Sequence, residues 1–228
     1  MPVFLLSDDI VFPSPHLASK EGLLAVGGDL TQERLLLAYR MGIFPWFSNN
    51  EPIMWWSPDP RLVLFLEDVK ISRTLNKIIK KKMFHVTMDS AFGQVINQCA
   101  QVRLQNNQAT WIVEEMIDAY CKLHELGFAH SVEAWYQGEL AGGLYGVSLG
   151  GSFFGESMFT RISNASNITF VKLVEYLLAL SFDMIDCQIA TEHFIRFGAK
   201  EIPRAHYLKK LNASLKRPTL KGRWTLPT

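Results

Sequence analysis

Two carboxylates and an amide beside apolar strand segments are the residues of this sequence best suited to chemistry. Glu156 ends one expected strand, and Asp186 and Gln188 lie in the next expected strand. Because side chains alternate along a strand, Asp186 and Gln188 are expected to share one face. An acid and an amide are costly to bury on a strand otherwise made of Ile, Met and Cys. They therefore indicate a site that orients a polar group, unless they form a satisfied polar pair at a sheet end.

A second candidate site is a positively charged helix face. The spacing predicts a helix over residues 70–82 with one apolar face and one basic face. Almost no acidic residue is interleaved, so pairing within the helix leaves this charge largely uncompensated. The basic face is either simply solvated or binds the phosphates of a nucleic acid. Its residues are Arg73, Lys77, Lys80 and Lys81.

Tryptophans on irregular segments form a third candidate. The chain holds six tryptophans, and Trp46, Trp55, Trp56 and Trp111 lie near Pro, Ser or Asn. A single ring of this kind belongs more often to the core than to a binding site. Several rings on Pro-rich turns, close to a basic helix, are also suited to stacking on an unpaired base.

The sequence lacks the common motifs for metals, nucleotides and disulfides. His124 and Glu125 do not form an HExxH zinc motif, because Phe128 stands where the second histidine would be. Neither a GxGxxG motif nor a Walker lysine is present. The three cysteines are far apart and include no CxxC pair, which favours reduced, buried thiols. We therefore expect no bound metal and no cofactor.

The elements that must position these residues differ along the chain. Residues 1–60 are rich in Pro, turns and aromatic residues and contain one clear helix, capped by Asp29 or Thr31. Later segments alternate as strands joined by glycine turns, which is typical of hairpins. Further helices are expected over residues 89–103, with Asp89 as N-cap, and over 110–126, 164–180 and 192–197, with strands over 131–136, 140–149, 152–159 and 184–190.

These elements predict an α+β fold with a smaller, mostly helical N-terminal domain. We place this domain at residues 1–62 and a larger domain at residues 63–228, with the boundary somewhere between residues 60 and 110. The tail from Arg204 onwards is basic and is expected to be less regular.

Bulk composition narrows the classes of function. Of the 228 residues, 48% are hydrophobic and 20% are charged, which is typical of a globular protein. No apolar run approaches the roughly 18 residues that a membrane span needs, and the N-terminus lacks the basic start of a secretory signal. We therefore expect a cytoplasmic protein that binds no membrane. The net charge of +1 means that any nucleic-acid site must be local.

Six segments together resemble the leucyl/phenylalanyl-tRNA–protein transferase family. Among them, GIFPWF, WWSPDPR and GESMF contain several of the candidate residues described above. The resemblance extends from Phe12 to about Tyr207, which is nearly the whole chain. The segments are residues 22–30, 42–47, 55–61, 123–127, 155–159 and 185–188.

The resemblance implies a fold and a reaction. The C-terminal domain would have a GNAT-like acyltransferase fold. The donor would be an aminoacyl-tRNA carrying Leu or Phe, with Met as a poorer donor. The acceptor would be a protein that begins with Arg or Lys, and the product would be marked for degradation by a bacterial N-degron pathway.

The resemblance also implies roles for individual residues. Asp186 and Gln188 would be the catalytic pair, with Glu156 lining the site. Trp46 and Trp111 would lie near the terminal adenosine of the tRNA. The amino-acid pocket would include Leu144, Phe153 and Gly155, although the family is expected to have Met in place of Leu144.

The implied reaction does not require Asp186, Gln188 or Glu156 to act as a strong base. The donor ester is already activated, and a protein α-amine has a reference pKa of about 7.7–8.0, so a strong base is not obligatory. We expect Asp186 to orient Gln188, to attract the acceptor ammonium and to assist proton transfer. Gln188 is expected to position the amine or the carbonyl. Glu156 is a candidate partner for the basic side chain of the acceptor.

Two other classes of function are open from the residues alone. A CoA-dependent N-acyltransferase would need a glycine-rich turn to hold the pyrophosphate, but residues 160–166 contain no glycine, so we expect no CoA. A non-catalytic RNA-binding module would leave the cluster of Glu156, Asp186 and Gln188 without a purpose.

Overall fold

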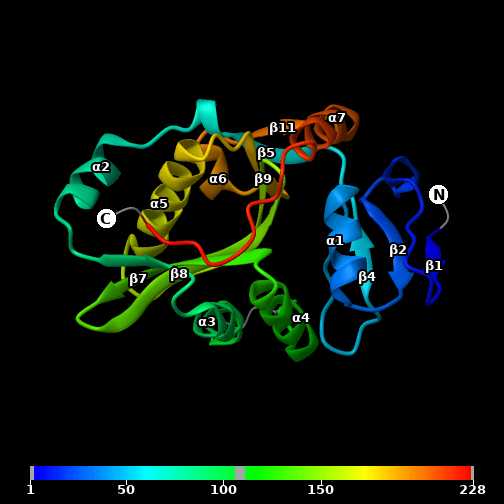
Figure 1. Ribbon diagram of the computed structural model, residues 1–228, viewed down its shortest axis with the longest axis horizontal. Coiled ribbons are helices and arrows are strands. Elements are labelled where there is room, and N and C mark those ends of the chain that lie inside the picture. Colours follow the sequence, from blue (N-terminus) through cyan, green and yellow to red (C-terminus); the bar gives the residue numbers. More distant parts are fainter. Residues whose placement is uncertain (1–2, 106–110, 227–228) are drawn as a thin grey trace.

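The N-terminal part of the chain is built on a small sheet. The computed structural model describes residues 3–105 and 111–226, and its first sheet has the strand order β1-β2-β4-β3 (Figure 1). The helix α1 (Gln32–Arg40) packs against it, and the Thr31 side chain accepts a hydrogen bond from the Arg34 backbone N–H, as expected for its N-cap. The other elements are β1 (Phe4–Leu6), the 3-10 helix η1 (Pro15–Leu17), β2 (Leu23–Gly27), β3 (Phe44–Pro45) and β4 (Met54–Trp56).

The prediction that this domain is mostly helical is wrong. Proline-rich aromatic segments cannot continue a helix, and two of them pair instead as the short strands β3 and β4. Residues 22–29, for which the sequence analysis predicts no strand, contain β2, which pairs with both β1 and β4. Trp55 on β4 is fully buried, and its indole N–H donates to the Gly27 carbonyl. Pairing across the domain, not local periodicity, determines this part of the fold.

The larger sheet has seven strands in the order β11-β5-β10-β9-β8-β7-β6. Its centre is the antiparallel meander β7-β8-β9, whose two hairpin turns lie where the sequence predicts them. Strands β5, β6 and β11 were not expected from the sequence. The strands are β5 (Arg61–Phe65), β6 (His85–Met88), β7 (Ala129–Tyr136), β8 (Glu139–Leu149), β9 (Ser152–Thr160), β10 (Met184–Gln188) and β11 (Lys200–Ile202).

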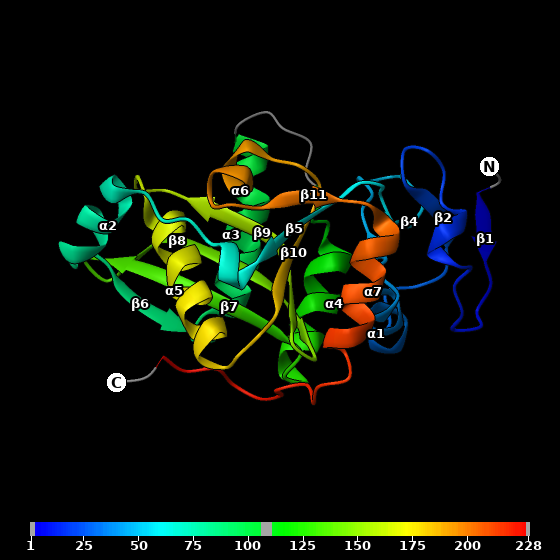
Figure 2. The same cartoon turned by 90° about the horizontal axis from the view of Figure 1, so that it is seen from above.

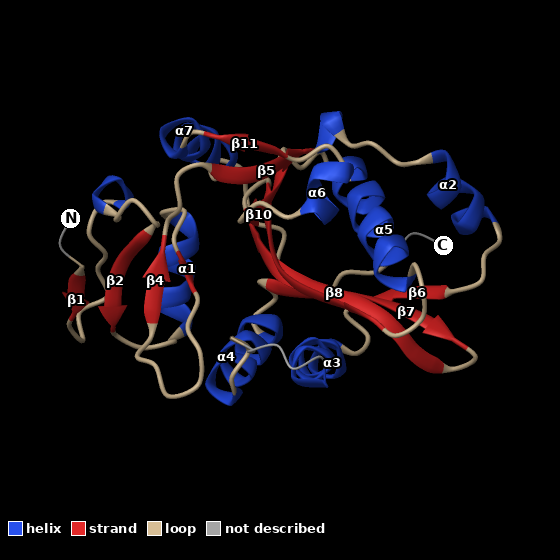
Figure 3. Cartoon of the chain, turned by 180° about the vertical axis from the view of Figure 1, so that it is seen from behind, coloured by secondary structure: helices blue, strands red, loops and turns tan. Residues whose placement is uncertain are grey.

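Helices cover both faces of the larger sheet. Figure 3 shows α3 and α4 on one face and α5 on the other. Seen from above, α2 lies at the end of the molecule opposite the N-terminal sheet (Figure 2). The elements are the 3-10 helix η2 (Leu66–Asp68), α2 (Arg73–Lys80), α3 (Phe92–Gln105), α4 (Glu114–Glu125), α5 (Ala165–Ala179), α6 (Glu192–Arg196) and α7 (Arg204–Ser214).

Two expectations about these helices are wrong. Asp89 is not the N-cap of α3, because the helix begins three residues later and Asp89 has a positive φ of 50°. Its buried carboxylate instead accepts hydrogen bonds from the backbone N–H groups of Ser131 and Trp224. The tail is also more regular than expected, since α7 runs from its first residue. Both errors come from contacts with distant parts of the chain, which local spacing does not reveal.

Strands β9 and β10 leave an opening in the larger sheet. They pair in parallel only over residues 152–154 and 184–186. Just beyond these pairs, β9 has a bulge at Glu156, and the register of β10 against β5 shifts between Asp186 and Gln188. Bulges of this kind re-aim side chains and end strand pairing, often beside functional sites. We call this gap between β9 and β10 the sheet opening. Within the described ranges, no helix combines the length and apolar character needed to cross a membrane.

Candidate active site

A cavity of about 400 Å³ passes through the sheet opening. Leu144 and Tyr145 are neighbours on β8, and both line this cavity although their side chains belong to opposite faces of the sheet. On the side of the N-terminal domain and α4, the walls are aromatic and include Trp46 and Trp111. On the α5 side they are apolar and include Phe153. The cavity therefore has two compartments joined at the opening.

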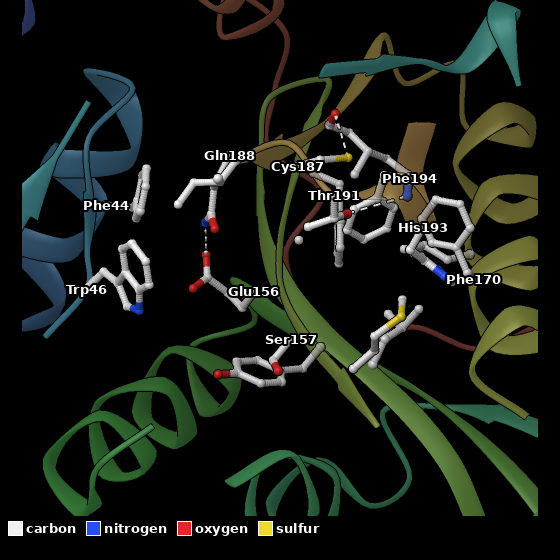
Figure 4. Close-up of a pocket in the computed structure, with 18 of the residues that line it drawn as sticks. Phe44, Trp46, Glu156, Ser157, Phe170, Cys187, Gln188, Thr191, His193 and Phe194 are labelled. Atoms are coloured by element: carbon white, nitrogen blue, oxygen red, sulfur yellow. Dashed lines mark hydrogen bonds between the residues drawn. The ribbon is translucent and has the colours of Figure 1, made fainter. Parts of the chain in front are cut away.

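Glu156 and Gln188 face each other at the junction of the two compartments (Figure 4). The Gln188 Nε2 group donates a hydrogen bond of 3.0 Å to Glu156 Oε1. Tyr39 of α1 donates to the same oxygen at 2.7 Å, and Tyr120 of α4 donates to Oε2 at 3.0 Å. The two tyrosine hydroxyls also contact each other. The N-terminal domain thus contributes directly to the centre of the site.

The environment of Glu156 favours its protonated form. Burial raises the pKa of this carboxyl to about 7, and the nearby charge of Asp186 adds to the rise. Hydrogen bonds from Tyr39, Tyr120 and Gln188 act in the opposite direction, but they do not outweigh the burial. Glu156 can therefore gain or lose a proton near neutral pH, which is common for groups at active sites.

Asp186 lies behind this pair and does not line the cavity. Its carboxylate forms a buried two-point ion pair with Arg61, with Nε–Oδ1 and Nη2–Oδ2 distances of 2.8 and 2.7 Å. Tyr207 of α7 donates to Oδ2 at 2.7 Å, and the Gln188 backbone N–H donates to Oδ1 at 2.9 Å. All four hydrogen bonds come from within the protein, so both oxygens of the carboxylate are occupied.

The expectation that Asp186 and Gln188 share one strand face is wrong. Gln188 has a positive φ of 62°, and the strand register shifts between the two residues. Strict alternation is lost there, so Gln188 lines the cavity while Asp186 does not. Gln188 is nevertheless held at two points, because Asp186 binds its backbone N–H and Glu156 binds its side-chain amide.

Seven of the residues predicted for the site line the same cavity. Phe153 and Leu144 are buried in its α5 compartment, whereas Trp46 is 40% exposed at the other end. Trp46 is close to Trp56, with ring centroids 5.9 Å apart. The seven residues are Trp46, Trp111, Leu144, Phe153, Gly155, Glu156 and Gln188.

The predicted basic face lies outside the cavity. In α2, Leu75 is buried, whereas Arg73, Lys77, Lys80 and Lys81 are exposed. None of these four residues forms an ion pair with any part of the chain that the structure describes. The helix is therefore amphipathic as expected, with its positive charge uncompensated and available to solvent.

Several residues of the site were missed by the sequence analysis. Tyr39 and Tyr120 fit the apolar spacing of their helices, which gives no sign that they belong to the site. Arg61 was noted only as part of a proline-rich segment. It lies between the rings of Phe44 and Tyr207, with its guanidinium carbon 4.7 and 4.8 Å from the ring centroids. The one available signal was an arginine beginning an otherwise apolar segment.

The site has no group of ligands suited to a metal. Among the described residues, no three or more His, Cys, Asp or Glu side chains cluster in a way that could hold an ion. The turn between β9 and α5 does not form a glycine cradle for a pyrophosphate, and Asn164 in this turn has a left-handed φ of 70°.

Comparisons with known proteins give a consistent result. A family model described as leucyl/phenylalanyl-tRNA protein transferase matches residues 63–212, and a model of the N-terminal domain of such proteins matches residues 28–59. Curated proteins named leucyl/phenylalanyl-tRNA–protein transferase are similar over nearly their full length. The relative from Desulfatibacillum aliphaticivorans is 58% identical over 99% of this chain and 97% of its own. The relative from Desulforapulum autotrophicum is 56% identical over 98% of each chain.

Similarity to solved structures is much weaker. L-PGS from Bacillus licheniformis has a TM-score of 0.42 and 10% identity, covering 74% of this chain and 53% of that protein. A conserved protein of unknown function from Bacteroides thetaiotaomicron has a TM-score of 0.43 and 8% identity, covering 86% of this chain and 66% of that protein.

Replacing Glu156 by Gln tests the electrostatics of the site through folding stability. The pKa of Glu156 is raised in the folded state, so the native protein binds this proton more tightly than the unfolded chain. The carboxyl therefore lowers the free energy of unfolding as pH rises from about 4.5 to above 7, by up to about 3 kcal/mol. Relative to the parent, Glu156→Gln should become steadily more stable between pH 5 and pH 8 in denaturant titrations. A difference that does not depend on pH would contradict the raised pKa.

Proposed function

The chain belongs to the leucyl/phenylalanyl-tRNA–protein transferase family, and from this premise we propose how its cavity carries out the transfer. The enzyme has leucyl/phenylalanyl-tRNA–protein transferase activity. In our proposal it moves Leu or Phe, and Met less well, from an aminoacyl-tRNA to the N-terminal Arg or Lys of an acceptor protein. The modified protein would then enter an N-degron pathway in the bacterial cytoplasm.

The two-compartment cavity is the observation that carries this proposal. A donor of this class has an adenosine at one end and an apolar side chain at the other, joined by an ester. Trp46 and Trp111 offer rings for the adenosine, on the side of the N-terminal domain. Leu144, Phe153 and Gly155 border an apolar space on the α5 side that suits a leucyl or phenylalanyl group. The ester would then lie at the sheet opening.

The strand order supports a GNAT-like catalytic domain, divided from the N-terminal domain near residue 62. An antiparallel meander leads through α5 to β10, which pairs in parallel with β9 and then separates from it. The gap left between these two strands is the sheet opening. Here Glu156 and Gln188 close it with a side-chain hydrogen bond of 3.0 Å. The absence of a glycine-rich turn after β9 argues against CoA as the donor.

Orientation is the main contribution of the catalytic residues in this proposal. The donor ester is activated before it binds, and part of the acceptor α-amine is neutral at pH 7. Alignment of amine and carbonyl can supply several kcal/mol without a strong base. Because Gln188 Nε2 donates to Glu156, its Oε1 atom is left to accept a hydrogen from the acceptor amine. Glu156 fixes the amide and, when ionised, attracts the positive charge of the acceptor.

Asp186 acts through Gln188 in this proposal. Its two oxygens are occupied by Arg61, Tyr207 and the Gln188 backbone, so it is a positioning residue. The ion pair with Arg61 fixes the carboxylate, and the carboxylate fixes the left-handed backbone of Gln188. Attraction of the acceptor ammonium is then the role of Glu156, which faces the cavity.

A transfer assay with matched peptides tests the proposed acceptor. The protein should move labelled phenylalanine from Phe-tRNA to a peptide that begins with Arg or Lys. The same peptide with an acetylated N-terminus should receive none, since the amine is the nucleophile. A peptide that begins with Ala should be a much poorer acceptor. Equal transfer to the Ala and Arg peptides would contradict the assignment of basic acceptors while leaving the transferase activity intact.

Asp186→Asn tests the positioning role. Loss of the carboxylate charge should lower peptide transfer at least about tenfold, or 1.4 kcal/mol, while Phe-tRNA binding stays unchanged. The fold should also lose about 3–5 kcal/mol, because the buried Arg61 guanidinium would lack its partner.

A double variant separates the two effects of Asp186. Arg61→Met with Asp186→Leu removes both buried charges, so folding stability should return in part, less the cost of leaving the Tyr207 hydroxyl without an acceptor. Transfer should stay low, because the Gln188 backbone N–H still has no acceptor. If transfer recovers together with stability, Asp186 serves only the fold.

The basic face of α2 is proposed to bind tRNA phosphates. Replacing Arg73, Lys77, Lys80 and Lys81 by Ala should flatten the dependence of log affinity on log salt by about 3 units, at roughly 0.7–0.9 per phosphate contact. Titrating Phe-tRNA binding at several salt concentrations measures this slope. The melting temperature should hardly change, because Leu75 and the rest of the apolar face are retained. An unchanged slope would mean that this face is only solvated.

A further inference from the structure

Residues 216–226 form an extended segment that we call the C-terminal strap. After α7 it turns back along the sheet toward α5 (Figure 2). Trp224 is its one buried residue, with 2% of its surface exposed. Near its start, Thr219 Oγ1 accepts a hydrogen bond from the Gly150 backbone N–H at 3.0 Å. In the second half of the segment, Trp224 is the one buried side chain, and the Gly222 backbone N–H donates a hydrogen bond to the Gly127 carbonyl.

The anchor of the strap is specific in its geometry. The indole ring of Trp224 stacks on the imidazole of His130, with centroids 3.7 Å apart and planes 7° from parallel. The Trp224 backbone N–H donates to Asp89 Oδ2 at 2.6 Å, and the same oxygen is 2.8 Å from His130 Nδ1. The indole N–H has no hydrogen-bond partner within the described residues. Replacing the indole by another apolar group therefore breaks no side-chain hydrogen bond.

Trp224 also touches the wall of the cavity. Its ring centroid lies 6.0 Å from that of Phe153, which lines the α5 compartment. Phe153 is confined from another side by Gly146, since a Cβ atom there would lie 2.6 Å from the Phe153 ring. The Phe153 ring is thus held between the β8 backbone and the indole of the strap. Phe153 is 1% exposed, and the indole of Trp224 is one of the groups that cover it.

We propose that Trp224 is a specificity-determining residue, which sets the size of the aminoacyl compartment by supporting Phe153 from behind. The inference rests on the proposed binding of the donor side chain in the α5 compartment. Removal of the indole leaves a space into which Phe153 can withdraw, and the compartment becomes larger. A donor with a bulkier aromatic side chain than phenylalanine then fits better. The strap is in this sense a part of the donor site, although it touches no substrate.

Competition between two donors tests this role. Equal amounts of one tRNA charged with Phe or with Trp are offered together with a peptide that begins with Arg. The ratio of the two products gives the ratio of kcat/KM values, which does not depend on how much enzyme is folded. In Trp224→Leu and Trp224→Ala, the Trp/Phe ratio should rise at least about tenfold over the parent. Trp224→Phe keeps a ring against His130 and should raise the ratio less.

Two control variants show whether a change in the Trp/Phe ratio comes from the size of the compartment. Leu144→Ala enlarges the same compartment directly and should raise the ratio. Thr219→Val removes the hydrogen bond between the strap and Gly150 but keeps the indole of Trp224, so it should leave the ratio unchanged. If Leu144→Ala raises the ratio while none of the Trp224 variants does, the proposal for the strap is wrong and the compartment stands. If neither position matters, both the compartment and the strap proposal are overturned.

A double-variant cycle checks that Trp224 acts through Phe153. When Phe153→Leu is already present, adding Trp224→Leu should change the ratio by much less than it does in the parent. If the two substitutions change the Trp/Phe ratio independently, so that their effects multiply, Trp224 does not act through Phe153. A lower melting temperature with an unchanged ratio in every Trp224 variant would leave the strap as a purely structural element.

Discussion

The buried ion pair between Arg61 and Asp186 is the interaction on which the rest of the site depends. It joins β5 to β10, and both side chains are almost completely buried. The Arg61 guanidinium is flanked by Phe44 of the N-terminal domain and by Tyr207 of α7. A buried charge that loses its partner costs several kcal/mol, so these elements must assemble together. The same carboxylate then holds the backbone of Gln188. Domain packing and the orientation of one amide are therefore linked through a single pair.

The sheet opening places the residues held by this ion pair next to the cavity. Backbone groups in a sheet need partners, and neighbouring strands normally supply them along their full length. Here pairing between β9 and β10 ends after three residues, and bulges on both strands direct Glu156 and Gln188 across the gap. A side-chain hydrogen bond replaces the missing ladder. Because the gap passes through the sheet, one cavity reaches both faces, with tryptophan rings on one side and apolar side chains on the other.

Sequence reasoning predicted the elements whose signals are local. The apolar spacing of α1, α2 and α5 and the glycine turns of the central meander lie within short windows, so these elements were found. The N-terminal sheet was missed because its strands are short and pair with segments far along the chain. Tyr39 joins the site through a hydrogen bond to Glu156, 117 residues away, and Arg61 through a contact 125 residues away. No local pattern distinguishes such residues from ordinary core or linker positions. The register shift beside Gln188 was hidden for the same reason, since strand pairing creates it.

The two carboxylates of the site differ in how their charge is compensated. Asp186 has the permanent cation of Arg61, whereas the partners of Glu156 in the described chain are two hydroxyls and an amide, all neutral. In the mechanism proposed above, an acceptor with an ammonium group brings a positive charge next to Glu156. Such a charge favours the ionised carboxylate and lowers its pKa from about 7. By reciprocity, ionised Glu156 strengthens binding of the acceptor by the same free energy. In the proposed mechanism, a carboxyl with a pKa near neutral pH therefore couples binding of the acceptor to the charge state of the group that holds Gln188.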